Sequence, residues 1–429
     1  MTNKVELFPH IAGYKNIKEE GKQIIEILSN PNEFISRGAY IPRGWFLYGD
    51  PGMGKTRFVK DIAEYLDYPI VEISSSEAIK RQITTEQMLV SGFEEAIKQK
   101  RCIIFLDELD KMCGYDKYEY DVPDNIQNQK ILLHKLDEIK DMNGIVVFAT
   151  ANRRRILDDS VLRSGRFDRH IYFPNPAFGD RQDLITYFLG DIKIAEDITL
   201  FEMCKITGGN SCAEIESIVN EAKILMITNK KEKMDYESFN LAYNRINRED
   251  IPGENIAPSE KLKFLAYHEA GHCVVAYLLK PETIREVTLV RQGNGEGHLS
   301  LDKDDVCVYT QQEIEDHIKI GLAGCLSEQT MTGTLTWGSG DDLYNAGDLV
   351  DDMIRNGFFG VKHGYGVGEY RSPQYYEEYT KLHSNLLEKY NEETKVLVEN
   401  HKEEIEIIAQ ALMKDQKLTR KQIFELLEK

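Results

Sequence analysis

Residues 45–66 read WFLYGDPGMGKTRFVKDIAEYL, an apolar run, a glycine-rich turn and an amphipathic stretch in succession. The turn, GDPGMGKT, satisfies the pattern G-x-x-x-x-G-K-[ST], which binds phosphate when it lies between a strand and a helix. In that setting backbone N–H groups surround the phosphates, Lys55 reaches the β- and γ-phosphates and Thr56 ligates Mg²⁺. The stretch therefore predicts the strand, loop and helix of a nucleotide-binding α/β domain.

Further short β-rich runs follow at intervals as far as residue 173. They are IVEI at 70–73, CIIFL at 102–106, IVVFAT at 145–150 and HIYF at 170–173. Nearly continuous apolar strands that are separated by helical segments indicate a parallel sheet with helices on both faces. We expect this α/β subdomain to occupy residues 1–178.

The rest of the chain is expected to be mainly helical. From 179 to 250 apolar residues recur at helical spacing around the break GGNS, which predicts a small helical lid subdomain. The polar segment that follows contains two prolines and a glycine, so we place a linker at 251–260. Residues 261–429 then form a second domain, helical apart from a β-like patch at 286–301.

The composition is that of an ordinary globular protein. The length of 429 residues suggests two or three domains, and 41% hydrophobic with 29% charged residues argues against disorder. No apolar run approaches the roughly 20 residues that span a bilayer, and the N-terminus lacks a secretory signal. Seven cysteines without CxxC spacing fit a reducing compartment, and the net charge of −19 opposes binding to nucleic acid. We expect a cytoplasmic protein without a transmembrane segment of its own.

Two acidic residues follow the apolar run at 102–106. Asp107 comes directly after the run and Glu108 follows it. A carboxylate at the exit of such a strand can ligate Mg²⁺ through water, and its neighbour can polarise an attacking water. Together with the phosphate loop, the pair predicts ATP hydrolysis with Mg²⁺ as the cofactor.

The second half opens with HEAGH at 268–272. Residues four apart lie on one face of a helix, so His268 and His272 are predicted to hold one Zn²⁺ while Glu269 acts on its water. The neighbouring positions are apolar, which predicts that this helix is mostly buried. A buried histidine pair without a ligand would need other hydrogen-bond partners.

A catalytic zinc takes three protein ligands, so one more must come from elsewhere in the chain. His298 is one candidate, although it lies in a β-like segment. Carboxylates are the other option, and the residues alone leave the choice open. The carboxylate candidates are Glu328, Asp341, Asp342, Asp348, Asp351 and Asp352.

Four motifs together resemble the ATPase module of the AAA superfamily. They are GDPGMGKT, IIFLDELD at 103–110, FATANR at 148–153 and LRSGRFDRHI at 162–171. The resemblance implies that Asn152 senses the γ-phosphate, and that Arg166 and Arg169 are arginine fingers for a neighbouring subunit's ATP. The nucleotide-binding residues that it implies are Ile11, Ala12, Gly13, Asp50, Pro51, Gly52, Met53, Gly54, Lys55, Thr56, Arg57 and Asp107.

The order of these parts resembles the FtsH family of ATP-dependent zinc metalloproteases nearly from end to end. In that family an aspartate of a G-[AS]-x-[ND]-D-[IL] stretch is the third zinc ligand, and GSGDDL at 338–343 puts Asp342 in that place. Glu328 falls where the family has a glutamate near the metal, and EGHLSL at 296–301 falls on an edge strand. The resemblance also implies protein substrates and a homohexamer.

We therefore expect an ATP-dependent zinc metalloendopeptidase that unfolds proteins and delivers them to the HEAGH site. The alternative is an AAA remodelling ATPase or chaperone with a weak or scaffold peptidase domain. The sequence departs from the family in the pore loop that grips the substrate. The family has an aromatic–apolar–glycine triplet in this loop, and the corresponding residues here are Arg81, Gln82 and Ile83.

Overall fold

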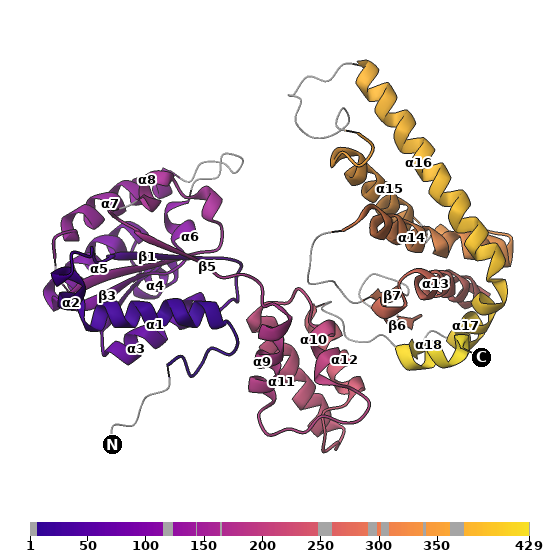
Figure 1. The fold of residues 1–429 in the computed structure, drawn as a ribbon, viewed down its shortest axis with the longest axis horizontal. Helices are drawn as coiled ribbons and strands as arrows, with labels where there is room; N and C mark the ends of the chain where they lie inside the picture. The colour runs from indigo at the N-terminus through magenta and orange to yellow at the C-terminus, as the bar shows by residue number, and fades with distance from the viewer. Residues whose placement is uncertain are drawn as a thin grey trace. The chain divides into compact units, whose positions relative to one another are not determined.

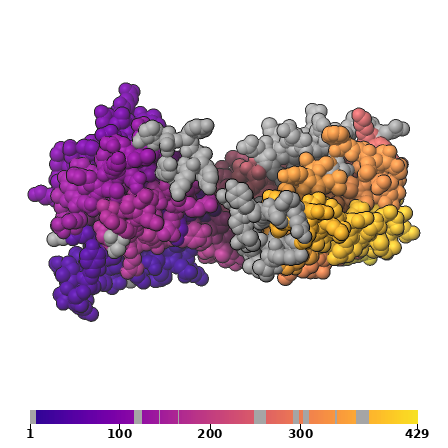
Figure 2. All heavy atoms as spheres, turned by 90° about the horizontal axis from the view of Figure 1, so that it is seen from above, coloured from indigo at the N-terminus to yellow at the C-terminus, as the bar shows by residue number. Residues whose placement is uncertain are grey.

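The computed structural model describes residues 7–114, 123–142, 144–163, 165–247, 260–290, 298–301, 309–337, 340–360 and 373–428. Figure 1 shows these residues as a coloured ribbon, and Figure 2 shows the atoms of the chain with all other residues in grey. The chain divides into two compact units, Met1–Phe239 and Asn240–Lys429. The expected linker at 251–260 lies almost wholly outside the described residues.

The first unit is built on a five-stranded parallel sheet with the order β2-β3-β4-β1-β5. Its strands are β1 (Gly44–Tyr48), β2 (Ile70–Ile73), β3 (Cys102–Leu106), β4 (Ile145–Ala151) and β5 (Arg169–Tyr172). The central strands β3 and β4 are buried at every position, as expected when helices cover both faces. The α/β fold class predicted from the sequence is confirmed.

Helices cover the sheet on both faces because side chains alternate along each strand (Figure 1). Trp45 and Leu47 pack with α1 and α3, whereas Phe46 packs with α5, α6 and α7. The helices of this subdomain are α1 (Lys15–Ser29), α2 (Pro31–Ser36), α3 (Lys55–Leu66), α4 (Ser75–Arg81), α5 (Thr85–Gln99), α6 (Leu109–Cys113), α7 (Pro123–Ile139) and α8 (Asp159–Leu162). A 3-10 turn spans Arg154–Ile156.

A group of helices follows the sheet, as the sequence predicts. They are α9 (Phe178–Leu189), α10 (Leu200–Ile206), α11 (Cys212–Thr228) and α12 (Tyr236–Asn247). Ser211 caps α11 by accepting a hydrogen bond from the backbone of Glu214, whose side chain accepts one from Ser211 N in return. The unit boundary between Phe239 and Asn240 falls within α12.

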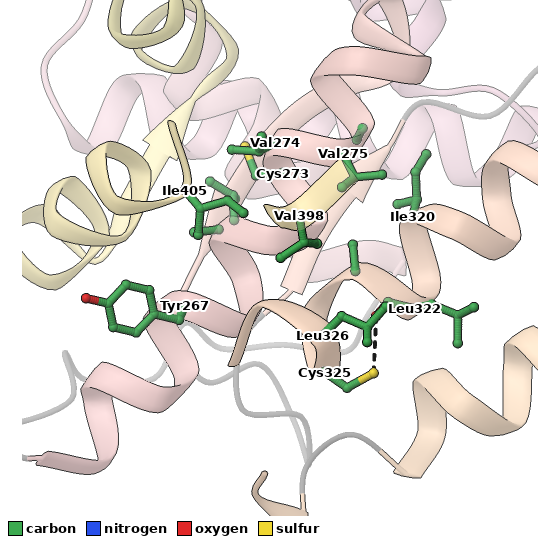
Figure 3. Packing of buried hydrophobic residues seen from close by; sticks show 14 of the residues in the cluster. Tyr267, Cys273, Val274, Val275, Ile320, Leu322, Cys325, Leu326, Val398 and Ile405 are labelled. Carbon is green, nitrogen blue, oxygen red and sulfur yellow. Dashed lines mark hydrogen bonds between the residues drawn. The ribbon is translucent and has the colours of Figure 1, made fainter. Parts of the chain in front are cut away.

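The second unit is mainly helical and is organised around α13 (Glu260–Leu279), which is buried without interruption from Ala266 to Ala276. A helix that is buried all round belongs in the centre of a domain. Figure 3 shows part of a buried cluster that Val274 of this helix shares with Leu326 of α14, Val398 of α16 and Ile405 of α17. The other helices are α14 (Gln311–Thr332), α15 (Gly340–Arg355), α16 (Pro373–Asn400), α17 (Lys402–Asp415) and α18 (Arg420–Leu427), and a 3-10 turn spans Pro281–Thr283.

A small antiparallel sheet with the order β7-β6-β8 completes this unit. The strands β6 (Ile284–Thr288) and β7 (His298–Leu301) fall in or beside the β-like patch that the sequence shows, and β7 lies at an edge. The sequence does not predict the third strand, β8 (Lys417–Thr419), because three residues between two helices carry too little pattern. Among the described residues, no helix combines the length and the apolar character that crossing a membrane requires.

Candidate metal centre and nucleotide site

Three side chains from two helices meet at one point in the second unit. His268 and His272 lie one turn apart on α13, and Asp342 lies in the first turn of α15. The distances are 2.9 Å from His268 Nε2 to Asp342 Oδ2, 3.1 Å between the two Nε2 atoms, and 3.4 Å from His272 Nε2 to Asp342 Oδ2. Tetrahedral zinc with bonds of about 2.0–2.1 Å places its ligand atoms about 3.3 Å apart. The three donors therefore fit a zinc ion and leave a fourth position for water.

The other nitrogen of each histidine also has a neighbour. His272 Nδ1 lies 2.7 Å from the carbonyl oxygen of Ile320, which can only accept, so Nδ1 carries the hydrogen and Nε2 keeps its lone pair for a metal. Glu328 Oε2 lies 3.7 Å from Nδ1 of His268, whereas Asp342 lies at Nε2 of the same ring. Glu328 is thus placed to orient His268 rather than to share the metal with it.

A glycine of α14 leaves room for the two histidine rings. A Cβ atom at Gly324 would lie 2.7 Å from His268 Nε2 and closer still to His272 Nε2. Any side chain at this position would crowd the donor atoms. Gly324 is part of the centre although it offers no ligand, and nothing in the local sequence distinguishes it from other glycines.

Glu269 completes the centre with a buried carboxyl group. The residue is 3% exposed, and its Oε2 has no hydrogen-bond partner within the described ranges. Burial raises the pKa of Glu269 to about 8, against the opposing charge of His272. A carboxyl group with an unused oxygen and a pKa near neutrality is suited to accept and return a proton.

The charges of the ligands depend on one another when no metal is bound. Burial opposes the charge of Asp342, but hydrogen bonds from His268 and His272 hold its pKa well below the usual range. Burial likewise opposes the charge of His272, but Asp342 and Glu269 raise its pKa to about 9. A metal cation would take the place of that proton between the same groups.

The other sequence candidates do not join this group. Within the described part of the chain, His268, His272 and Asp342 form a set whose donor atoms all lie within 4.8 Å of one another. His298 lies on β7, and the other candidate aspartates lie elsewhere on α15. Two residues of the GSGDDL motif, at 338–339, fall outside the described ranges.

In the first unit, the phosphate loop joins β1 to α3 and surrounds the amino group of its own lysine. Lys55 Nζ donates to the carbonyl oxygens of Gly49 and Asp50, at 2.7 Å each, and to Asn152 Oδ1 at 2.8 Å. Burial lowers the pKa of Lys55, although nearby carboxylates oppose this effect. Gly52 and Gly54 have φ angles of 79° and 87°, which glycine adopts most readily.

The acidic pair lies beside this loop, at the carboxyl end of β3. Asp107 Oδ1 is 3.2 Å from Thr56 Oγ1, so the two expected Mg²⁺ ligands are adjacent. Thr150 of β4 donates to Asp107 at 2.5 Å, and its oxygen accepts from the backbone of Glu108 at 2.9 Å. Thr150 therefore links the two acidic residues, a role that the sequence does not reveal.

Asp110 provides a second link that the sequence does not reveal. Its Oδ2 accepts hydrogen bonds from the backbone N–H groups of Asn152 at 3.1 Å and Arg153 at 2.9 Å. These bonds fix the turn after β4 and so the Asn152 side chain beside Lys55. The only signal is the fourth position of DELD, which cannot be interpreted without knowing which strands are neighbours.

Comparison with known proteins finds one family in each half of the chain. Residues 45–175 match the ATPase family associated with various cellular activities (AAA), and residues 255–426 match peptidase family M41. The chain belongs to the FtsH-type family of AAA zinc metalloproteases.

Several curated relatives of this FtsH-type chain carry the name ATP-dependent zinc metalloprotease FtsH. The one from Thermus thermophilus is 29% identical, over 98% of this chain and 70% of the relative. The one from Aquifex aeolicus is 32% identical, over 81% and 56%, and FtsH 2 from Petrotoga mobilis is 33% identical, over 82% and 57%. The chain thus spans little more than half the length of most of these relatives.

Gly13, one of the expected nucleotide-binding residues of this FtsH-type chain, and its neighbour Tyr14 lie against the start of α9. Gly13 has a φ of 64°, and a Cβ there would lie 3.0 Å from Asp180 Cα. Tyr14 N donates to Asp180 Oδ1 at 2.7 Å, and Tyr14 Oη donates to Pro174 O at 2.6 Å. Ala213 N donates to Gly52 O at 3.1 Å, so the start of α11 lies against the phosphate loop.

The two expected arginine fingers differ in their surroundings. Arg166 is buried and bonds Asp137 at 2.9 Å and the carbonyl oxygen of Ser160. Arg169 is more exposed and lies 3.9 Å from Glu20. Their action on a neighbouring subunit's ATP stays a prediction.

Proposed function

We propose that the chain is an ATP-dependent zinc metalloendopeptidase, which uses ATP hydrolysis to unfold proteins and deliver them to the HEAGH site. The observation that carries the proposal is the convergence of His268, His272 and Asp342 around one point, with the carboxyl group of Glu269 buried beside them. The same chain carries a phosphate loop whose Lys55 donates a hydrogen bond to Asn152. A chaperone with a merely structural peptidase domain would have no use for this donor set.

In the peptidase reaction the chain would supply the ligands and the proton carrier. A bound Zn²⁺ supplies Lewis acidity to the scissile carbonyl and acidifies a water. His268, His272 and Asp342 would hold the ion, and Glu328 would orient His268. Glu269 would take the proton from the attacking water and return it to the leaving amine.

In the ATPase reaction the groups around the phosphate loop would bind and orient the nucleotide. Lys55 would leave its carbonyl partners for the β- and γ-phosphates, while Thr56 and Asp107 would hold Mg²⁺. Glu108 would polarise the attacking water, and Asn152 would contact the γ-phosphate. Residues 11–13 would flank the adenine.

Assembly and location belong to the same proposal. We expect a homohexamer in which Arg166 and Arg169 reach the ATP of the next subunit; Arg166 would then exchange its bond to Asp137 for phosphate. A cytoplasmic location is supported by the sequence, whose seven cysteines are an odd number without CxxC spacing and fit a reducing compartment.

Casein cleavage and ATP hydrolysis, measured on the zinc-loaded chain, test the proposal. Wild type is expected to cleave casein faster with ATP. Glu269→Gln should abolish cleavage and keep ATP hydrolysis, whereas Glu108→Gln should abolish ATP hydrolysis and the stimulation that depends on it.

A matched pair of aspartates controls for the metal. Asp342→Asn should lose zinc and cleavage together, while Asp341→Asn, the exposed neighbouring position, should keep both. Wild type that binds zinc and hydrolyses ATP but cleaves neither casein nor short peptides would refute the peptidase assignment.

A further inference from the structure

A buried carboxylate on α3 is part of neither the metal centre nor the phosphate loop. Asp61 lies on the helix that begins with Lys55 and Thr56, and its side chain is 1% exposed. Its Oδ1 lies 2.8 Å from Arg57 Nε and 3.3 Å from His10 Nδ1. A buried carboxylate is costly unless cationic or hydrogen-bonding groups compensate its charge, and these two side chains supply that compensation.

The two partners of Asp61 differ in what they connect. Arg57 lies one turn away on the same helix, so its ion pair with Asp61 is local. His10 comes from the N-terminal segment, 51 positions away. The His10 contact therefore ties that segment to α3, where Phe8 also stacks on Phe58 with ring centroids 5.3 Å apart.

The tied segment leads directly into residues 11–13, the expected neighbours of the adenine. On their other side, Tyr14 is fixed to α9, because its backbone N–H donates to Asp180 Oδ1 at 2.7 Å. The first two of the three residues are partly exposed, so a ligand can contact them. Residues 11–13 are thus held at both ends, and the His10 end is held to α3.

Helix α3 also carries groups that are expected to contact the phosphates. Lys55 and Thr56 lie in its first turn, and Asp61 lies roughly 7–8 Å further along the helix axis. Because a helix is stiff over this length, a segment tied at Asp61 keeps a fixed distance from the phosphate loop. The His10 contact therefore relates the position of the base to that of the phosphates.

Stability alone does not explain this arrangement. Asp61 Oδ2 is buried and has no hydrogen-bond partner within the described ranges, and an unsatisfied buried oxygen lowers stability. The side chain of His10 is 45% exposed, so water screens its contact with Asp61 and the contact adds little to the free energy of folding. What the contact does provide is a defined position for the residues that follow His10.

We propose that His10 and Asp61 are positioning residues for the nucleotide, and that their contact holds residues 11–13 at the distance from the phosphate loop that the base of ATP requires. This inference rests on the proposed ATPase function and deepens it. Residues that already lie in the bound arrangement cost less free energy to order when the ligand binds, so the affinity for ATP rises. A ligand with phosphates but without a base gains nothing from the contact.

Two ligands separate the base from the phosphates, because ATP carries both and inorganic tripolyphosphate carries the phosphates alone. The experiment uses the zinc-loaded full chain with Glu108→Gln and Mg²⁺, which is expected to bind ATP without hydrolysing it. Calorimetric titration gives the Kd of ATP, and displacement of ATP by tripolyphosphate gives the Kd of the ligand without a base. The unfolding temperature without ligand monitors the stability of each variant.

Adding His10→Ala should weaken ATP binding about tenfold and change the Kd of tripolyphosphate less than about twofold. His10→Asn should restore most of the affinity, because its side-chain N–H group takes the place of Nδ1. Asp61→Asn should act in the same direction as His10→Ala, and combining the two should add little, since both remove one contact. His134→Ala, at an exposed histidine of α7, is the control and should change neither affinity.

The inference fails on any of three results. The first is an ATP affinity that His10→Ala leaves unchanged. The second is a parallel loss of affinity for ATP and tripolyphosphate, which a general loosening of the unit would produce. The third is a chain with Glu108→Gln alone that binds ATP no more tightly than tripolyphosphate. Failure of the proposed function is a separate outcome, in which the wild-type chain binds ATP more tightly than tripolyphosphate but hydrolyses none.

Discussion

The metal centre and the nucleotide site are both formed in the chain by itself, but they are built from different parts. The metal centre consists of side chains from α13 and α15, which meet where α14 has no side chain. The nucleotide site combines the backbone of the phosphate loop with side chains at the ends of β3 and β4, and its Lys55 already has three oxygen partners. The metal centre therefore depends on the space that Gly324 leaves beside the two histidines. The nucleotide site depends on hydrogen bonds of Lys55 that ATP must replace.

The largest expected effect tests the empty space at the metal centre. Gly324→Ala should reduce zinc affinity by more than about 100-fold, because a Cβ would crowd the donor atoms. Zinc stoichiometry and competition with a chelating dye measure the effect. Gly321→Ala on the same helix is the control, since the nearest atom to its Cβ would be Asp342 O at 4.0 Å.

Alanine favours a helix over glycine by a similar amount at both positions, so a difference between the two variants reports the centre itself. If Gly324→Ala binds zinc as tightly as wild type does, the donors do not meet where the structure places them.

The next effect concerns the orientation of the zinc ligand His268 rather than the space around it. Glu328→Gln should lower zinc affinity about 10- to 100-fold, because a buried carboxylate beside His268 Nδ1 strengthens that ligand. Equilibrium competition for zinc measures it, and Glu388→Gln on the surface of α16 is the control. Unchanged affinity in Glu328→Gln would show that His268 needs no orienting partner.

At the nucleotide site, the corresponding test is Asp110→Asn. The carboxylate of Asp110 accepts two backbone hydrogen bonds, and without its charge these bonds are weaker. The Asn152 side chain should then be held less firmly, and kcat/KM for ATP should fall about tenfold. Steady-state ATP hydrolysis measures this effect, and the exposed Asp124→Asn is the control. An Asp110→Asn variant with wild-type kinetics would contradict the link between Asp110 and Asn152.

The last prediction concerns a buried charge that belongs to neither site, so its effect is on stability and not on binding or rate. Burial alone would raise the pKa of Glu286 on β6, but Lys417 at 2.9 Å, Arg285 and Asn244 hold it below the usual range. A depressed folded pKa contributes stability above the unfolded pKa of 4.5, and the contribution is lost as the pH falls through the folded value. Glu286→Gln should therefore lower the stability of the second unit by ~1–3 kcal/mol at pH 7.

Urea unfolding at neutral and at acidic pH, below the ordinary glutamate pKa, checks this sign. The difference between wild type and Glu286→Gln should shrink on acidification. A difference that grows would mean that the carboxylate destabilises the folded chain.

The sequence predicts best those features that lie within one stretch of chain. The five strands, the phosphate loop and the histidine pair each have a local pattern that folding leaves unchanged. The choice of Asp342 needs family resemblance, because 74 positions separate it from His268 and several other carboxylates compete. Gly324 and Thr150 cannot be predicted, since their roles depend on which helices and strands become neighbours.

The most direct test of the account compares wild type with Glu269→Gln for zinc content and peptide hydrolysis in the same preparation. Both proteins should bind one zinc ion per chain, because Glu269 is not among the three donors, and wild type alone should cleave the peptide. Cleavage by Glu269→Gln at the wild-type rate, or no zinc in either protein, would contradict the assignment of HEAGH and Asp342 as a catalytic metal centre.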